Sequence, residues 1–284
     1  MMNYEPFGVS LEQDAEPIFV LSVEQDGVLP DEQRMAYQHM FTDNLEDDMP
    51  RIEVYRSLEK EWLIRISQIA TSPVCCELVS TSDFTRGILH IDGNCQDVCF
   101  CIDNALMLMY AFRTAPLKTL EMHAAVVVKG GEEARGYLFL GHSGTGKSTH
   151  ARQWLAAFED AWLLNDDNPV LRVMDDGQVR VYGSPWSGKT TCYKNADAPV
   201  GAIVKLSQAP CNTIQTVSLP QAYADMLSSA SGLKTEPTMA DNMFETIKYI
   251  ITHAPCYHLA CLPNKEAARV CCAGTNGSDV YGKE

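Results

Sequence analysis

The sequence predicts a mixed α/β protein in two parts, a β-rich N-terminal region at residues 1–116 and a second domain at residues 117–284. Short apolar runs separated by turn residues fill the first part, which is typical of β-strands. Longer apolar strands that alternate with turns and helical patterns fill the second part. One of these strands leads through a glycine-rich loop into an amphipathic helix, so this part combines both kinds of element.

The N-terminal region contains four predicted strands and one predicted helix. The strands are expected at residues 18–21, 52–55, 62–66 and 88–91, the last before the turn Asp92-Gly93-Asn94. The helix is expected from Asn104 to Arg113, because Leu106, Met109 and Tyr110 share one helical face and Pro116 marks its end. Apart from a group of cysteines considered below, no residue in this region indicates a particular chemistry, so its role stays open.

The second domain contains further strands and two helices beyond the glycine-rich loop. The strands are expected at residues 124–128, 137–140, 162–167, 202–206 and 257–262, with a hairpin at 170–173 and 179–182. Ser218 and Thr238 each stand three residues before a Gln or an Asp, which predicts helix starts with capping boxes. The tail from Gly274 is expected to be frayed.

The loop after strand 137–140 carries the strongest signal in the chain. Its sequence, Gly141-His142-Ser143-Gly144-Thr145-Gly146-Lys147-Ser148-Thr149, fits the phosphate-loop pattern G-x-x-x-x-G-K-[ST]. Ala151, Trp154, Leu155 and Phe158 follow at helical spacing. This strand, loop and helix context lets backbone N–H groups surround a phosphate at the positive end of a helix. The alternative is a plain glycine-rich turn with an incidental lysine.

The motif predicts ATP and Mg²⁺ as ligands. Lys147 is expected to reach the β- and γ-phosphates, and the Ser148 hydroxyl to bind Mg²⁺. The residues predicted to bind the nucleotide are Gly141, Ser143, Gly144, Thr145, Gly146, Lys147, Ser148 and Thr149.

The strand at 162–167 ends in two adjacent acids, Asp166 and Asp167. A phosphate-loop enzyme needs an acid at such a strand end to hold Mg²⁺, and a second acid can orient or deprotonate the nucleophile. We therefore predict Asp166 as a metal ligand and both acids as catalytic, while their division of roles stays open. The alternative is a simple turn, since Asp and Asn are good turn formers.

A second glycine loop, Gly183 to Thr190, satisfies the same pattern. We reject it as a nucleotide site, because Pro185 lacks a backbone donor and Asn195, Asp197 and Pro199 interrupt any following helix. We expect a rigid loop that closes over the site, with Lys189 available to an acidic substrate or phosphate. Arg172 is a second, weaker candidate for substrate contact.

Composition limits the partners and the compartment. The chain has a net charge of −15 and a pI near 4.8, which argues against nucleic acid or an anionic membrane as a partner. The N-terminus has acids and a proline where a signal peptide needs basic and apolar residues, so we expect the cytoplasm. The sequence does not determine the oligomeric state and allows a homo-oligomer.

The 11 cysteines have no regular spacing. We interpret them as mostly reduced, buried small residues, because a disulfide framework or zinc ribbon needs a regular pattern. Cys95, Cys99 and Cys101 form the one metal-like group, for which the alternative is an ordinary strand.

The chain from residue 117 to about 265 resembles the HPr kinase/phosphorylase family and, more distantly, the phosphoenolpyruvate carboxykinases. The resemblance rests on His123-Ala124-Ala125-Val126 at a strand start, on the loop GHSGTGKST, and on the Asp166-Asp167 pair. It implies the nucleotide-binding core that these families share, and a role in phosphoryl transfer for His123 and one of the two acids. A small branch of HPr-kinase-like proteins has a similar G-S-P-W-S-G-K loop.

The leading interpretation is a Mg²⁺-dependent kinase that transfers phosphate from ATP to a hydroxyl of a serine, peptide, protein or small molecule. The HPr kinase signature beyond the core is not found, so the acceptor stays open. The alternative is a nucleotide sensor without catalysis, and a carboxykinase-type enzyme is less consistent because its oxaloacetate-binding Arg is not found. His142 and His150 are left out of the chemistry, the first on a variable loop position and the second expected on the helix surface.

Overall fold

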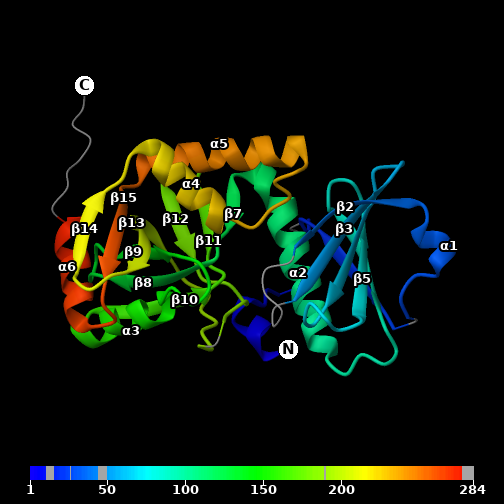
Figure 1. The fold of residues 1–284 in the computed structure, drawn as a ribbon, viewed down its shortest axis with the longest axis horizontal. Coiled ribbons are helices and arrows are strands. Elements are labelled where there is room, and N and C mark those ends of the chain that lie inside the picture. The colour runs from blue at the N-terminus through cyan, green and yellow to red at the C-terminus, as the bar shows by residue number, and fades with distance from the viewer. Residues whose placement is uncertain (11–15, 26, 44–49, 189, 277–284) are drawn as a thin grey trace. The chain divides into compact units, whose positions relative to one another are not determined.

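The computed structural model describes residues 1–10, 16–25, 27–43, 50–188 and 190–276 (Figure 1). The chain forms two compact units, one of Leu11–Arg113 and one of Met1–Ser10 with Thr114–Glu284. Each unit has a β-sheet with helices packed on it, which establishes a mixed α/β architecture with two sheets.

The Leu11–Arg113 unit contains a six-stranded sheet in the order β1-β6-β5-β4-β3-β2. Its strands are β1 (Val20–Glu24), β2 (Tyr37–Asp43), β3 (Arg51–Ser57), β4 (Trp62–Ser67), β5 (Val74–Ser80) and β6 (Arg86–Ile91), with a short helix α1 (Asp31–Arg34). Neighbours are antiparallel except β1 and β6, which are parallel. The strands predicted at 52–55, 62–66 and 88–91 are confirmed, and the one predicted at 18–21 begins two residues later, at Val20. Strands β2 and β5 were not expected.

The long helix α2 (Val98–Thr114) packs on this sheet. The Phe112 ring stands edge-on to Phe84 at 5.0 Å, and Ser80 Oγ donates to Met109 Sδ at 3.5 Å. The helix begins six residues before the expected Asn104, because the carboxylate of Asp97 accepts a hydrogen bond from the Phe100 backbone N–H and caps the first turn.

The segment Val98–Leu117 is the one stretch, among the described residues, that is long and apolar enough to cross a membrane. Because Ala105 and Met109 on this helix are fully buried inside the protein, its apolar face belongs to the core of the unit. One helix of this kind is not enough to indicate a membrane protein.

The second unit is built on a nine-stranded sheet whose main path runs β10-β8-β9-β13-β12-β11-β7, with β15 joining β13 and β14. The strands are β7 (Thr119–Glu121), β8 (Ala124–Lys129), β9 (Arg135–Leu140), β10 (Ala161–Asp167), β11 (Val170–Val173), β12 (Val179–Tyr182), β13 (Asp197–Gln208), β14 (Thr213–Thr216) and β15 (Cys256–Cys261). β9 is parallel to β13, and β8 is antiparallel to both β9 and β10. The predicted strands and the hairpin of β11 and β12 are confirmed.

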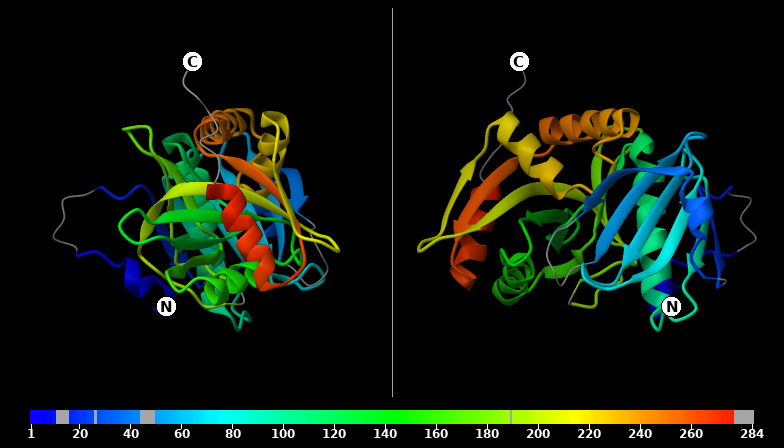
Figure 2. Two further views of the ribbon diagram at one scale, coloured as in Figure 1. Left: turned by 90° about the vertical axis from the view of Figure 1, so that its left-hand side faces the viewer. Right: turned by 45° about the vertical axis from the view of Figure 1, so that its right-hand side comes forward.

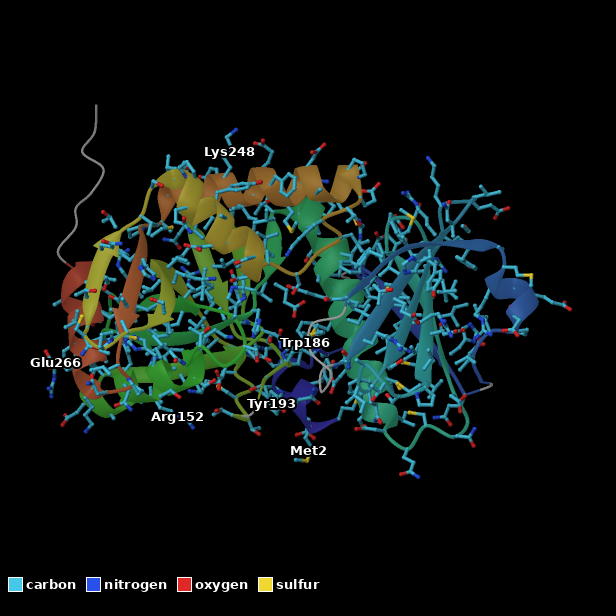
Figure 3. All side chains as sticks on the ribbon, in the orientation of Figure 1. Met2, Arg152, Trp186, Tyr193, Lys248 and Glu266 are labelled. Atoms are coloured by element: carbon cyan, nitrogen blue, oxygen red, sulfur yellow. The ribbon has the colours of Figure 1, made fainter. Side chains whose placement is uncertain are left out.

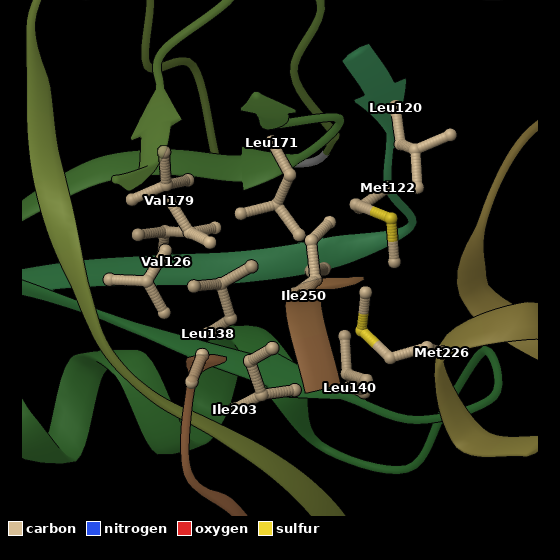
Figure 4. Packing of buried hydrophobic residues seen from close by; sticks show 14 of the residues in the cluster. Leu120, Met122, Val126, Leu138, Leu140, Leu171, Val179, Ile203, Met226 and Ile250 are labelled. Carbon is tan, nitrogen blue, oxygen red and sulfur yellow. The ribbon is translucent and has the colours of Figure 1, made fainter. Parts of the chain in front are cut away.

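Helices cover both faces of this sheet (Figures 1 and 2). They are η2 (Ala115–Leu117), α3 (Lys147–Ala157), α4 (Leu219–Ser229), α5 (Pro237–His253) and α6 (Lys265–Asn276). Val126 and Leu138 pack with α4 and α5 on one face (Figure 4), while Ala125 and Phe139 pack with α3 and α6 on the other. The period-two alternation of β8 and β9 therefore places apolar side chains on both faces of a fully covered sheet.

Several local expectations differ from the structure. Leu155 is exposed although the helical pattern placed it on the buried face. Ser218 caps α4 by position, but its side chain makes no capping bond. Helix α5 is capped by Glu236, whose carboxylate accepts from Met239 N at 2.8 Å, and not by Thr238. Strand β14 and helix α6 were not expected, and Gly274 lies within α6.

The N-terminal segment η1 (Met2–Phe7) packs within the second unit. Trp186 Nε1 donates to Tyr4 Oη at 3.0 Å, and Asn3 Nδ2 donates to the Pro185 carbonyl at 3.1 Å. Asn195 Nδ2 donates to the Pro6 carbonyl at 3.0 Å. The first ten residues therefore hold the second glycine loop, whose Trp186 is labelled in Figure 3.

Candidate active site

The loop from Gly141 to Gly146, here called the first glycine loop, joins β9 to α3. Gly144 and Gly146 have φ angles of 74° and 110°, a backbone region that L side chains rarely adopt. A side chain at Gly141 would be obstructed for another reason, since a Cβ there would lie 3.0 Å from the Thr145 side chain. The loop therefore needs glycine at all three positions.

The first glycine loop ends at the N-terminus of α3, where Gly146 provides no capping side chain. In the described part of the chain, the backbone N–H groups of Ser143, Gly144 and Gly146 have no hydrogen-bond partner, whereas Thr145 N donates to the His142 carbonyl at 3.2 Å. Free N–H groups at a helix N-terminus attract anions. Ser148 and Thr149 follow half-buried in the first turn of α3.

Lys147 lies across this loop. Its Nζ donates to the Gly141 carbonyl at 3.1 Å and lies 2.9 Å from His123 Nε2. The residue is buried, and desolvation lowers the pKa of its ammonium group, an effect that the nearby carboxylates of Asp167 and Asp166 oppose. A phosphate would supply the negative charge that this buried cation needs.

Sheet topology explains why the distant candidates meet here. Ala124 at the start of β8 pairs with Leu140 at the end of β9 and also with Asp167 at the end of β10. The residue before β8 is His123. Antiparallel pairing thus brings His123, the glycine loop and the acid pair to one edge of the sheet.

His123 Nε2 lies 3.0 Å from Asp167 Oδ1 and 2.9 Å from Lys147 Nζ. One ring nitrogen cannot donate to a carboxylate and accept from an ammonium group at the same time. Protonated at Nε2 the ring bonds to Asp167, and unprotonated it accepts from Lys147. The two contacts are therefore alternatives, and the group that His123 faces depends on where one proton sits.

The two acids differ in environment. Asp166 is 3% exposed, whereas the Asp167 side chain is 39% exposed. Asp167 has a φ of 128°, which is costly for a residue other than glycine and is found mainly at functional sites. The buried carboxylate suits a fixed metal ligand, and the exposed one suits contact with a substrate.

The second glycine loop holds this strained strand end. Gly188 N donates to the Asp166 carbonyl at 2.6 Å, and Ser187 forms a β-bridge with Asp167. Residues 190–196 form no helix. Lys189, predicted to face the substrate, lies outside the described residues.

Other candidates fall in different places. Arg172 is exposed in the middle of β11, opposite Arg180 and Thr119, and in the described part of the chain it shares no hydrogen bond or ion pair with the other candidates. His142 is exposed in the first glycine loop. The surface position expected for His150 is wrong, because it is 3% exposed and its Nε2 accepts from Trp154 Nε1 at 3.0 Å.

Sequence reasoning missed Glu121, a buried acid next to this site. It is 1% exposed, and neither carboxylate oxygen has a hydrogen-bond partner in the described structure. Burial, aided by the negative charge of Asp167, raises the pKa of Glu121 to about 8. Its signal in the sequence was an acid between Leu120 and Met122, two residues before His123.

A groove with a volume of about 750 Å³ opens on the other side of the first glycine loop. Its walls come from that loop, from the end of β13 and from β15. Lys205, Gln208 and His258 are among its polar lining groups, and Gln208 Nε2 donates to the Gly144 carbonyl at 3.3 Å. A groove of this size at the carboxyl ends of parallel strands is typical of a ligand site.

Comparison with known proteins adds no assignment: no protein-family model matches the chain, and no curated protein matches it at a significant level. The case for a function therefore rests on the residues and geometry of this site.

Proposed function

We propose that the protein is a Mg²⁺-dependent kinase that transfers the γ-phosphate of ATP to a hydroxyl group, on a core of the HPr kinase and phosphoenolpyruvate carboxykinase type. One observation carries the proposal: beside the first glycine loop, His123 Nε2 lies 2.9 Å from Lys147 Nζ and 3.0 Å from Asp167 Oδ1. A cation for phosphate, a base and a carboxylate are thus within one site.

The phosphates of ATP would lie against the free amides of the first glycine loop and against Lys147. Ser148 and Asp166 would hold Mg²⁺, because a hydroxyl and a carboxylate are the hard oxygen ligands that this ion prefers. The bound ion would neutralise charge on the phosphates. The groove of about 750 Å³ is large enough for the nucleoside.

The acceptor hydroxyl would approach from the side of Asp167, whose carboxylate is the exposed one of the pair. The oxygen of the acceptor hydroxyl forms a bond to the γ-phosphorus. At the same time the bond between that phosphorus and the bridging oxygen breaks, and ADP leaves. The hydroxyl proton passes to Asp167 or to His123. Lys147 stabilises the charge on the transferred group.

The test is transfer by the purified full-length chain with MgATP and a panel of serine, peptides, small alcohols and water, followed by phosphate mass shifts. Asp166→Asn and Asp167→Asn keep the size of each side chain and remove its charge. At least one should lower turnover by a factor of about 100 or more, the scale of general-base or charge-stabilising groups. The variant whose turnover depends less on the Mg²⁺ concentration than that of the wild type identifies the metal ligand.

Asp160→Asn is a matched control, because Asp160 lies just before the opposite end of β10 and pairs with Lys129 at 3.1 Å. It should leave turnover unchanged. Wild-type protein that binds MgATP but transfers phosphate to nothing in the panel would contradict the kinase and favour a nucleotide sensor.

A further inference from the structure

Three cysteines of the Leu11–Arg113 unit bring their sulfur atoms together. The Sγ atoms of Cys75, Cys95 and Cys101 all lie within 4.8 Å of one another. Cys75 belongs to β5, Cys95 to the turn after β6, and Cys101 to the first turn of α2. The packing of a single strand, turn or helix does not explain why three sulfur atoms from three different elements lie together.

A β-bulge directs Cys75 toward this group. Cys76 pairs with Ile66 and Val74 pairs with Ser67, so Cys75 is the extra residue in β5. A bulge interrupts the alternation of side chains along a strand. The Sγ atom of Cys75 accordingly lies within 4.8 Å of those of Cys95 and Cys101.

The other two thiols are fixed by local hydrogen bonds. Asn94 N donates to Asp92 Oδ1 at 2.7 Å, and Cys95 N donates to the Asp92 carbonyl at 2.9 Å, which defines the turn that carries Cys95. Cys101 follows the capping residue Asp97 of α2. Cys95 Sγ and Cys101 Sγ are 3.5 Å apart, too far for a disulfide.

The composition of the group favours a thiophilic metal. In a tetrahedral zinc site the Zn–S bonds are about 2.3 Å, which places sulfur atoms about 3.8 Å apart. Here Cys95 Sγ and Cys101 Sγ are 3.5 Å apart, and Cys75 Sγ lies within 4.8 Å of both.

We propose that Cys75, Cys95 and Cys101 bind a zinc ion through their three sulfur atoms. Such an ion would tie β5, the Asp92–Cys95 turn and α2 together, because each of these elements supplies one of its sulfur ligands. The proposal is independent of the kinase. It also replaces the group suggested by spacing alone, because Cys99 is exposed and does not belong to the group.

The experiment measures zinc on the full-length chain, purified with a reductant and dialysed against Zn²⁺. Elemental analysis should find one zinc per chain, and exchange for Co²⁺ should produce sulfur-to-cobalt charge-transfer absorption. Cys95→Ser and Cys75→Ser should weaken zinc binding, measured against a chromogenic chelator, by at least about tenfold, since outer-shell changes alone reach that size. Cys95 is only partly buried, so its variant should keep the wild-type circular dichroism spectrum.

Cys99→Ser is the matched control, because Cys99 lies on the same helix and is exposed. It should bind zinc like the wild type. Two results would overturn the proposal: a reduced wild type that takes up no zinc, or a loss of zinc binding in Cys99→Ser as large as that in Cys95→Ser.

Discussion

The two glycine loops of this chain match the same eight-residue pattern and have different structures. The first, at Gly141–Ser148, runs into α3 and leaves the N–H groups of Gly144 and Gly146 free in the described structure. The second, at Gly183–Thr190, uses the N–H groups of Gly183, Trp186 and Gly188 to bond to its own protein. A sequence pattern therefore identifies a phosphate site only when its amides stay available for a phosphate.

The loops also differ in what they do for the acid pair. The first places Lys147 next to His123, which contacts Asp167. The second bonds to the backbone of Asp166 and bridges to Asp167, and so holds the strained φ of 128°. We infer that the first loop binds phosphate and that the second supports the strand end with Asp166 and Asp167. Four predictions test that difference.

The largest expected effect concerns Glu121, a buried acid whose pKa is raised by burial and by the charge of Asp167. Its pKa rises from 4.5 to about 8 in the folded protein. Between these values the folded state keeps a proton that the unfolded state releases, so stability falls as pH rises. The fall from pH 5 to pH 9 should be on the order of 4 kcal/mol, at about 1.4 kcal/mol per pKa unit.

Glu121→Gln keeps the shape and cannot ionise, so urea unfolding of this variant at pH 5 to 9 should lack that decline. Glu266→Gln is the control, because Glu266 is 60% exposed in its pair with Arg269. A wild-type decline that persists in Glu121→Gln would show that another group causes it.

Glu121 also marks the limit of what the sequence could predict. Periodicity and turn chemistry report directly on residues that are neighbours in sequence. For this reason the sequence predicted the strands β8, β9 and β10, the first glycine loop and the lack of a helix at residues 190–196. Glu121 and the thiol group around Cys75 depend on pairing between distant segments, which one sequence does not encode locally. A β-bulge at Cys75 and a short strand β7 leave almost no periodic signal.

The next prediction compares the two lysines of the pattern. MgATP or MgADP at 100 times its dissociation constant should stabilise the wild type by ~2.7 kcal/mol. Lys147→Ala should abolish most of this gain, because it removes the buried cation that the proposed binding mode places against the phosphates. Lys189→Ala should keep the gain if the second loop serves the acceptor. Thermal shift and calorimetry measure both, and equal losses would show that the second loop also binds nucleotide.

A smaller effect is expected at His150, which ties the helix after the first loop into the core. Burial lowers the pKa of His150 from 6.5 to about 4, so the folded state stays neutral while the unfolded state gains a proton. Its contribution to stability is present above pH 6.5 and is lost as pH falls toward 4.

The loss between pH 7.5 and pH 4.5 should be on the order of 2 to 3 kcal/mol. His150→Gln keeps an acceptor for Trp154 Nε1 and removes the titration, so its acid-side decline should be smaller by that amount. His142→Gln, at an exposed position of the first loop, is the control. An identical acid decline in His150→Gln and the wild type would contradict the neutral buried imidazole.

The smallest effect tests whether the second loop is held by the start of the chain. Tyr4→Phe keeps the edge-on ring contact with Trp186 and removes the hydroxyl that accepts from Trp186 Nε1 at 3.0 Å. Losing one such hydrogen bond should cost about 1 kcal/mol. Tyr249→Phe removes a similar bond, at 3.0 Å to the Gly177 carbonyl, away from both loops, and should cost about the same. Hydrogen exchange separates the two: the Trp186 amide, which bonds to Ser184 Oγ, should exchange faster in Tyr4→Phe and at the wild-type rate in Tyr249→Phe. Because the first loop does not depend on this tether, nucleotide stabilisation should be the same in both variants. An unchanged Trp186 amide in Tyr4→Phe would mean that the second loop is held by its bonds to β10 alone.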